Sequence, residues 1–509
     1  MRASGIFMPI FSLPSKYGIG TMGKEAYAFA DFLSKAGQSY WQLLPLNPTD
    51  EGGSPYRSFS AMAGNPYLID LTVLCDKGLL TVAECEAEDF GDDPKAVDYE
   101  KLNNNRYRLL RSAFERFDTE TPDFLKFCHS EKAWLDDYAL FMVLKDNYAG
   151  KPWREWHDDI KFRKPIALRR ITDDNAREIE FYKFLQFEFF SQWFALKTYA
   201  NGLGIRIVGD IPIYVSDDSV DVWRNTKLFE LDENLCPRVV AGCPPDAYSA
   251  DGQLWGMPVY NWEHMKAEKK PYSWWRARIS HALKIYDTVR IDHFRGLESY
   301  YCIKYGAKNA KKGKWRKGPG LELFEYFRKD SGKNKMLPII AEDLGYLTPE
   351  VRKLLEDTGL PGMKVLQFAF DPSGKSDYLP HNHIRNCVVY TGTHDNDTVM
   401  GWVSSADPRE VAYARRYMHV DDNEGFNWAM IRTAMMSVAD TCIIMMADFM
   451  GLDSSARINT PSTVGCNWKW RIDGSCINDW LAGIIRENTM MYGRLGDNNG
   501  ISKKQTIKS

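Results

Sequence analysis

Short apolar runs that end in glycine or polar residues recur at eight places along the chain. Most of them are continuous rather than alternating, which is typical of parallel strands buried on both faces. We therefore predict a buried parallel sheet. The eight predicted strands are Gly5–Pro9, Ser39–Leu44, Ile205–Ile211, Thr288–Asp292, Pro338–Glu342, Met363–Phe368, Cys387–Thr391 and Cys442–Asp448.

Between these runs, hydrophobic residues recur with helical spacing. Phe29, Phe32 and Leu33 lie at positions i, i+3 and i+4, which predicts one amphipathic helix. Pro349 is suited to the first turn of another helix, and Gly359 to its end. Strand and helix alternate about eight times, which predicts an α/β fold, either a (β/α)8 barrel or a doubly wound sheet.

Two connections are too long for simple strand–helix units. The first, at residues 47–204, has helical apolar spacing and is predicted to be a mostly helical subdomain. The second, at residues 212–287, is rich in proline, glycine and aromatic residues, and is predicted to be an ordered, loop-rich insertion. Residues 1–509 are interpreted as one catalytic barrel unit that carries both insertions.

Composition and charge narrow the class of protein. With 44% hydrophobic and 26% charged residues, the 509-residue chain has ordinary globular composition. The net charge of -3 gives no general attraction to nucleic acid or to anionic membranes. There is no apolar run of membrane-spanning length, no convincing signal peptide and no CxxC pair among the 10 cysteines. We therefore predict a cytoplasmic protein without nucleic-acid or membrane partners.

Charged side chains gather where four of the apolar runs end. In a barrel the carboxyl ends of the strands meet at one rim, where catalytic groups are placed. Buried carboxylates are costly unless they are paired or functional, so four such strand ends favour an active site over separate salt bridges. The side chains concerned are Asp210; Arg290, Asp292, His293 and Arg295; Glu342 and Asp343; and His394, Asp395 and Asp397.

Two reaction types use a cluster of this kind. A retaining glycosidase pair combines a carboxylate nucleophile with a carboxylic acid that protonates the leaving oxygen. A metal-dependent hydrolase would use histidine and aspartate ligands, but the chain has only 9 histidines and no HxH pair in the cluster. No GxGxxG, P-loop or EF-hand pattern occurs, so neither a metal nor another cofactor is predicted.

At these positions the sequence resembles the amylomaltase family, family 77 of the glycoside hydrolases in the alpha-amylase clan. The segments RIDHFRG, AEDLG and GTHDNDT are typical of the whole clan, whereas SPY and PPDAYSADGQLWG in this order are typical of amylomaltases. The resemblance covers nearly the whole chain. It implies a (β/α)8 barrel with insertions after strands 2 and 3, and without a C-terminal β-sandwich.

The resemblance implies a 4-alpha-glucanotransferase, which transfers alpha-1,4-glucan segments from a donor to a 4-hydroxyl group with retention. Asp292 matches the nucleophile, Glu342 the general acid/base and Asp395 the third carboxylate, which stabilises the transition state. Arg290 is then expected to keep Asp292 ionised, because a neighbouring cation lowers the pKa of a carboxyl group. Glu342 must start protonated, so its site is expected to raise its pKa.

The resemblance also implies a set of glucan-binding residues. Tyr56 matches the aromatic side chain on which a glucosyl ring rests, and residues 244–262 match a loop that overhangs the cleft. The sequence departs from the family at Met257, usually Asn, and at Ser462, usually Gly. The implied substrate-binding residues are Tyr56, Asp210, Asp246, Tyr248, Gln253, Trp255, Arg290, His293, His394, Asn459 and Pro461.

Two further functions share these features. A plain alpha-glucan hydrolase would use the same carboxylates, with water in place of the acceptor sugar. A catalytically silent glucan-binding protein is a different class, and the intact carboxylate trio argues against it because binding alone needs no nucleophile. The expected partners are alpha-1,4-glucans, from maltooligosaccharides to glycogen or starch. The sequence predicts neither an oligomeric state nor a preferred chain length.

Overall fold

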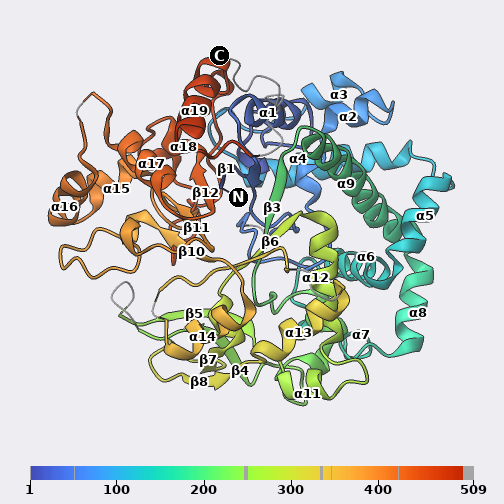
Figure 1. Ribbon diagram of the computed structural model, residues 1–509. Helices are drawn as coiled ribbons and strands as arrows, with labels where there is room; N and C mark the ends of the chain where they lie inside the picture. The colour runs from blue at the N-terminus through green and yellow to red at the C-terminus, as the bar shows by residue number, and fades with distance from the viewer. Residues whose placement is uncertain are drawn as a thin grey trace.

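Eight parallel strands form the centre of the protein in the computed structural model, which describes residues 2–50, 52–245, 250–332, 336–345, 347–421 and 423–496 (Figure 1). Their order is β10-β11-β12-β1-β2-β3-β6-β9, so neighbours around the sheet follow one another along the chain. The strands are β1 (Ala3–Phe7), β2 (Tyr40–Gln42), β3 (Arg206–Ile211), β6 (Thr288–Ile291), β9 (Ile339–Ala341), β10 (Gly362–Val365), β11 (Cys387–Tyr390) and β12 (Thr441–Met445).

The sheet nearly closes into a barrel between its first and last strands. The backbone N–H of Ala341 in β9 donates to the carbonyl oxygen of Pro361, just before β10, at 2.9 Å. The predicted barrel is therefore confirmed over the doubly wound alternative, and each predicted strand corresponds to a barrel strand. The last prediction, Cys442–Asp448, was too long, because the chain turns into helix α18 (Met446–Phe449) after β12.

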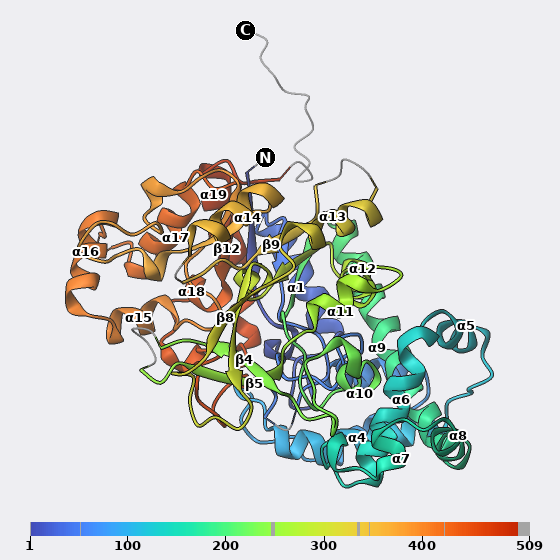
Figure 2. The same cartoon turned by 90° about the horizontal axis from the view of Figure 1, so that it is seen from below.

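Helices cover the outside of the barrel and form an extension beside it. Figure 1 shows the helices between β2 and β3 on one side of the barrel, and Figure 2 shows α5 and α8 projecting furthest from it. The helices before β3 are α1 (Lys24–Lys35), α2 (Leu71–Asp76), α3 (Val82–Glu86), α4 (Tyr99–Glu115), α5 (Pro122–Ser130), α6 (Lys132–Asn147), α7 (Asp158–Lys161), α8 (Pro165–Asp174) and α9 (Ala176–Gly202).

The longest helix, α9, joins this extension to the barrel. It carries apolar residues on all sides because it packs against α6 on one side and α1 and β3 on another. The indole N–H of its buried Trp193 donates to the carbonyl oxygen of Ile285 at 3.1 Å, which fixes α9 to the end of α12 (Ser273–Ile285). In the described part of the chain, no helix is both long and apolar enough to cross a membrane.

The remaining helices follow β3 and complete the outer layer. The predicted helix from Pro349 is confirmed, and Gly359 ends it in the left-handed conformation with φ 65°. These helices are α10 (Val220–Arg224), α11 (Trp262–Ala267), α12 (Ser273–Ile285), α13 (Leu321–Asp330), α14 (Pro349–Thr358), α15 (Val399–Ser405), α16 (Pro408–Met418), α17 (Phe426–Met436) and α19 (Asp479–Met491).

A second, antiparallel sheet lies beside the barrel and was not predicted. Its order is β5-β4-β7-β8, with β4 (Val239–Cys243), β5 (Gln253–Pro258), β7 (Ser299–Lys304) and β8 (Lys314–Lys317). Two of its strands lie in the insertion that was predicted to be loop-rich, and β8 lies in a lysine- and arginine-rich stretch. All four side chains of β8 are exposed, so this strand has no apolar pattern from which it could be predicted.

Candidate active site

The ends of β3 and β6 bring Asp210, Arg290 and Asp292 together. Asp210 and Arg290 are register partners on these neighbouring strands, so both side chains point to the same face of the sheet. Arg290 Nη1 lies 2.6 Å from Asp210 Oδ2, and Arg290 Nη2 lies 3.0 Å from Asp292 Oδ1. The Asp210 side chain is only 1% exposed, whereas that of Asp292 is 28% exposed. A ligand at the rim can therefore reach Asp292 more readily than Asp210.

Glu342 follows β9 and is held by two backbone N–H groups. His293 donates to Oε2 at 2.6 Å, and Leu344 donates to Oε1 at 2.9 Å. His293 adopts the left-handed conformation, with φ 54°, directly after Asp292. Such a conformation is uncommon outside glycine and is typical of functional sites. In this conformation the chain turns away from the end of β6, and the His293 N–H points to Glu342.

The carboxyls of Asp292 and Glu342 are electrostatically linked. Burial raises the pKa of both groups, that of Asp292 to about 8, and the charges of Asp210 and Glu342 contribute to the rise at Asp292. Arg290 lowers the pKa of both, but only Asp292 is in direct ionic contact with its guanidinium. The pair is therefore expected to share one proton near neutral pH. The expectation that Arg290 by itself keeps Asp292 ionised is wrong for the unliganded site, because burial raises the pKa of Asp292 by more than the Arg290 charge lowers it.

Asp395 follows β11 and is held by two neighbours. Asn459 Nδ2 donates to Asp395 Oδ1 at 2.6 Å, and His394 Nε2 lies 3.4 Å from Asp395 Oδ2. Burial lowers the pKa of His394, so its ring is neutral at neutral pH. The Asp395 side chain remains 46% exposed, which leaves it free to accept hydrogen bonds from a sugar.

Tyr56 forms an aromatic wall beside these carboxylates. Its hydroxyl donates to Asp210 Oδ2 at 2.6 Å, and its ring is stacked on that of His394 at 5.2 Å between centroids. The buried Trp468 packs behind both rings, at 5.8 Å from Tyr56 and 6.0 Å from His394. Burial and Asp210 raise the pKa of Tyr56 well above its usual value, so it remains a neutral donor.

The second sheet contributes Gln253 and Trp255 from β5. The indole N–H of Trp255 donates to Gln253 Oε1 at 3.0 Å, and its ring meets the His293 imidazole edge-on at 4.8 Å between centroids. Trp255 therefore contacts the residue whose N–H holds Glu342. Two other predicted residues of this segment, Asp246 and Tyr248, lie outside the described residues.

Comparisons with known proteins agree with this arrangement. The family model described as 4-alpha-glucanotransferase matches residues 8–476. The chain belongs to the 4-alpha-glucanotransferase family. The 4-alpha-glucanotransferase of Clostridium butyricum is 49% identical over 490 residues, covering 96% of this chain and 100% of the relative. The amylomaltase of Streptococcus agalactiae, solved in complex with acarbose, matches with a TM-score of 0.93 and 42% identity, covering 97% of this chain and 100% of that structure.

Membership of the 4-alpha-glucanotransferase family confirms the amylomaltase resemblance seen in the sequence. The protein is an enzyme with 4-alpha-glucanotransferase activity, and its barrel is that of the solved amylomaltase. The silent glucan-binding protein and the metal-dependent hydrolase are thereby disfavoured. Among the described residues, no group of three or more histidine, cysteine, aspartate or glutamate side chains is placed to hold a metal ion.

Arg457 is a feature of this 4-alpha-glucanotransferase that sequence reasoning missed. Its Nη2 donates to the carbonyl oxygen of Asp395 at 2.9 Å, and its Nε donates to that of Asn459 at 2.8 Å. The guanidinium thus joins the loop after β11 to the loop after β12. Arg457 lies within the ARINTPST segment that resembles the family. Two of its partners are backbone carbonyl groups, which no sequence pattern reveals, and a third is the Asp397 carboxylate, whose Oδ2 lies 3.8 Å from Nη1.

We expect Arg457→Lys to lower kcat by about 10- to 100-fold, because small misplacements of catalytic groups have effects of this size. Lysine retains the charge but cannot donate to both carbonyl groups in the fixed geometry of a guanidinium. The test is steady-state disproportionation of maltotriose, with the exposed Arg169→Lys as the matched control. An unchanged kcat, or an effect as small as that of the control, would contradict the positioning role.

The other predicted residues near Asn459 lie on the surface of the same loop. Pro461 is exposed, and Ser462 adopts the left-handed conformation with φ 65°. Glycine adopts this conformation without steric cost, which gives a physical reason for the glycine usual in the 4-alpha-glucanotransferase family. The side chain of Asn467 braces the loop by accepting from the Thr460 N–H at 2.9 Å and donating to the Thr463 carbonyl at 3.0 Å.

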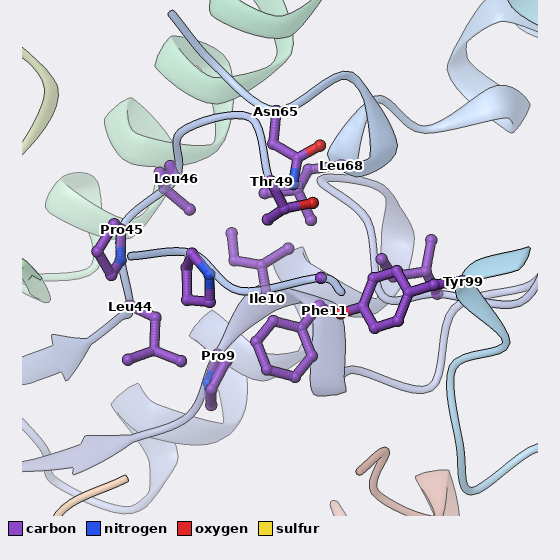
Figure 3. Close-up of a pocket in the computed structure, with 13 residues that line it drawn as sticks. Pro9, Ile10, Phe11, Leu44, Pro45, Leu46, Thr49, Asn65, Leu68 and Tyr99 are labelled. Atoms are coloured by element: carbon purple, nitrogen blue, oxygen red, sulfur yellow. The ribbon is translucent and has the colours of Figure 1, made fainter. Parts of the chain in front are cut away.

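A small cavity lies close to the Tyr56 segment, between the first two barrel strands and the loop that follows them (Figure 3). Its volume of about 20 Å³ suits a single water molecule and is far too small for a sugar ring. The hydroxyl of Thr49, on its wall, is buried without a hydrogen-bond partner among the described residues. The cavity is therefore not the substrate site of this 4-alpha-glucanotransferase.

Proposed function

We propose that the enzyme transfers alpha-1,4-glucan segments by a retaining double displacement, with Asp292 as nucleophile and Glu342 as general acid/base. The observation that carries the proposal is the unequal environment of the two carboxyls. Arg290 is in ionic contact with Asp292 and favours its ionised form, whereas Glu342 has no such contact and accepts from two backbone N–H groups. An ionised nucleophile beside a protonated acid is the starting state that this mechanism needs.

In the first step, Asp292 attacks the anomeric carbon of the donor while Glu342 protonates the glycosidic oxygen. The bond from this carbon to the glycosidic oxygen breaks, and a bond to an Asp292 oxygen forms. The donor's reducing-end fragment leaves with the proton. Asp395 is proposed to bind hydroxyl groups of the reacting sugar, because Asn459 and His394 orient its carboxylate while leaving it accessible.

In the second step, an acceptor sugar completes the transfer. Its 4-hydroxyl gives its proton to Glu342, its oxygen bonds to the anomeric carbon, and Asp292 is released as a carboxylate. Tyr56 is proposed to support a glucosyl ring of the donor. Gln253 and Trp255 are proposed to bind the acceptor, since they lie beside His293 and Glu342.

Three other predicted substrate-binding residues, Asp210, His293 and Pro461, are proposed to shape the site and not to bind the sugar directly. Asp210 is nearly fully buried, and one of its oxygens is bound by both Arg290 and Tyr56, so we propose that it positions these two side chains. Burial lowers the pKa of His293 to about 3, so this side chain acts only as a neutral contact for Trp255. Pro461 is proposed to shape the loop next to Asn459.

The first test is incubation of the purified enzyme with maltotriose alone, in the presence of EDTA. Disproportionation predicts free glucose together with a ladder of longer maltooligosaccharides, formed at the same rate with and without the chelator. Glucose and maltose without longer products would mean that water is the main acceptor. The enzyme would then be a hydrolase and not a transferase. A rate that falls with EDTA and returns with added metal would contradict the metal-free mechanism.

We further propose that the substrates are maltooligosaccharides and the outer chains of glycogen or starch, and that the enzyme acts in the cytoplasm. The location is supported by the cysteines, all ten of which are free thiols. Cys75 and Cys85 lie only 3.8 Å apart at their sulfur atoms and are not bonded to each other. Reduced cysteines are typical of the cytosol.

A further inference from the structure

A second cavity, of about 190 Å³, lies among the outer helices and not among the residues of the strand ends. It is lined by residues of α5, α9 and α12, and its walls are largely aromatic. Phe187, Phe190 and Phe194 come from α9, and Phe127 comes from α5. Of these four, only Phe190 is fully buried, and the other three line the cavity while remaining partly exposed.

Unused hydrogen-bonding groups accompany these rings. His281 Nε2 lies 2.8 Å from the carbonyl oxygen of Met62, so Nε2 carries the hydrogen and Nδ1 is an acceptor. Burial lowers the pKa of His281, which keeps the ring neutral. Neither His281 Nδ1 nor the hydroxyl of Ser191 makes a hydrogen bond to another described residue, and both residues line the cavity.

The charges at the cavity cancel. Glu131 and Lys284 both line it and form an ion pair with each other, and Glu131 also accepts from the indole N–H of Trp134 at 2.8 Å. A phosphate or a carboxylate would therefore meet no free cation among these residues. The cavity favours a neutral ligand with an apolar face and hydroxyl groups at its edge.

The size of the cavity suits one six-membered ring, since an apolar cavity of about 150 Å³ holds benzene. A pyranose ring has this size, with C–H groups on its faces and hydroxyl groups around its edge. We propose that the cavity binds one glucosyl unit of an alpha-1,4-glucan, as an anchoring site separate from the transfer site. The inference rests on glucan as the substrate class and does not depend on the roles of Asp292 and Glu342.

Such an anchor acts on long chains and not on short ones. A polymer held at the cavity raises the concentration of its other ends near the transfer site, whereas a trisaccharide held there gains nothing. Loss of the anchor is therefore expected to raise KM for amylose about 3- to 10-fold, with KM for maltotriose and kcat for both substrates unchanged. A fault in the transfer site would instead affect both substrates.

Binding can be measured directly because the chain has only 9 histidines. Glu342→Gln enzyme labelled with ¹³C at histidine Cε1 is titrated with maltose and followed by NMR. His281 reports on the cavity, while His293 and His394 report on the transfer site. We expect maltose to shift the signals of both sites. A shift at His394 alone would overturn the anchoring site and leave the proposed function intact.

Ser191→Leu supplies the matched test, since the larger side chain fills the cavity. It should abolish the His281 shift and raise KM for amylose, whereas Ser280→Leu, at an exposed position of α12, should do neither. If Ser191→Leu lowers the melting temperature, Phe187→Ala provides a second variant that removes one aromatic wall. A His281 signal that moves with indole but not with maltose, or amylose kinetics unchanged in both variants, would overturn the proposal.

Discussion

Asp292→Asn is expected to lower the transfer rate by at least about 10⁴-fold, as losses of nucleophiles in other enzymes do. An amide cannot form the glycosyl–enzyme bond that the retaining mechanism requires. The fold should survive, because Arg290 keeps its ion pair with the buried Asp210. The measurement is the rate of maltotriose disproportionation, together with the melting temperature of the variant.

The control for this variant is Asp92→Asn, which makes the same chemical change at an exposed position. It should leave the rate unchanged. Mass spectrometry of the native enzyme with an activated donor such as alpha-maltosyl fluoride should detect an adduct on the peptide that contains Asp292. An adduct on another carboxylate, or an Asp292→Asn variant that retains more than about a tenth of the activity, would require a different nucleophile.

Glu342→Gln is expected to lower maltotriose disproportionation by about 10²- to 10⁴-fold, the usual contribution of general acid–base catalysis. The variant should also lose part of its pH dependence. Native Glu342 must be protonated in the first step and its pKa is raised by burial, so kcat/KM should fall as the pH rises through that pKa. Glutamine does not titrate, so the alkaline fall should disappear from the residual activity.

A donor with a good leaving group separates the two functions of Glu342. Alpha-maltosyl fluoride needs little protonation, so the first step should be largely restored in Glu342→Gln, while the second step still lacks its base. The intact glycosyl–enzyme should then accumulate in a fluoride burst. Equal losses with maltotriose and with the fluoride donor, or an alkaline fall that persists in the variant, would assign the acid to another residue.

The barrel could be predicted from the sequence because its strands are buried on both faces. Such strands are continuous apolar runs, and two of the three proposed catalytic carboxylates, Asp292 and Glu342, follow directly where the runs end. Strand ends were less certain: β12 stops at Met445 because the chain turns at once into α18, whose residues Met446 and Phe449 are as apolar as those of the strand. The apolar pattern alone does not distinguish these two continuations.

The second sheet could not be predicted for a different reason. β4 pairs with β7 although the barrel strand β6 lies between them in the sequence. Which of these strands meet therefore depends on the path of the chain through the barrel. The same holds for Arg457 and for the two N–H groups that bind Glu342. These contacts involve backbone atoms, which every residue possesses, so the chain's geometry decides them and no side-chain pattern reveals them.

The exposed strand β8 has a consequence for the behaviour of the protein in a crowded solution. It lies at the edge of the second sheet, where unpaired backbone groups could accept a strand from another molecule. Three of its four residues are Lys or Arg, and Gly318 and Pro319 follow directly. Concentrated positive charge and a nearby proline discourage intermolecular β-pairing, so this edge protects the enzyme against aggregation.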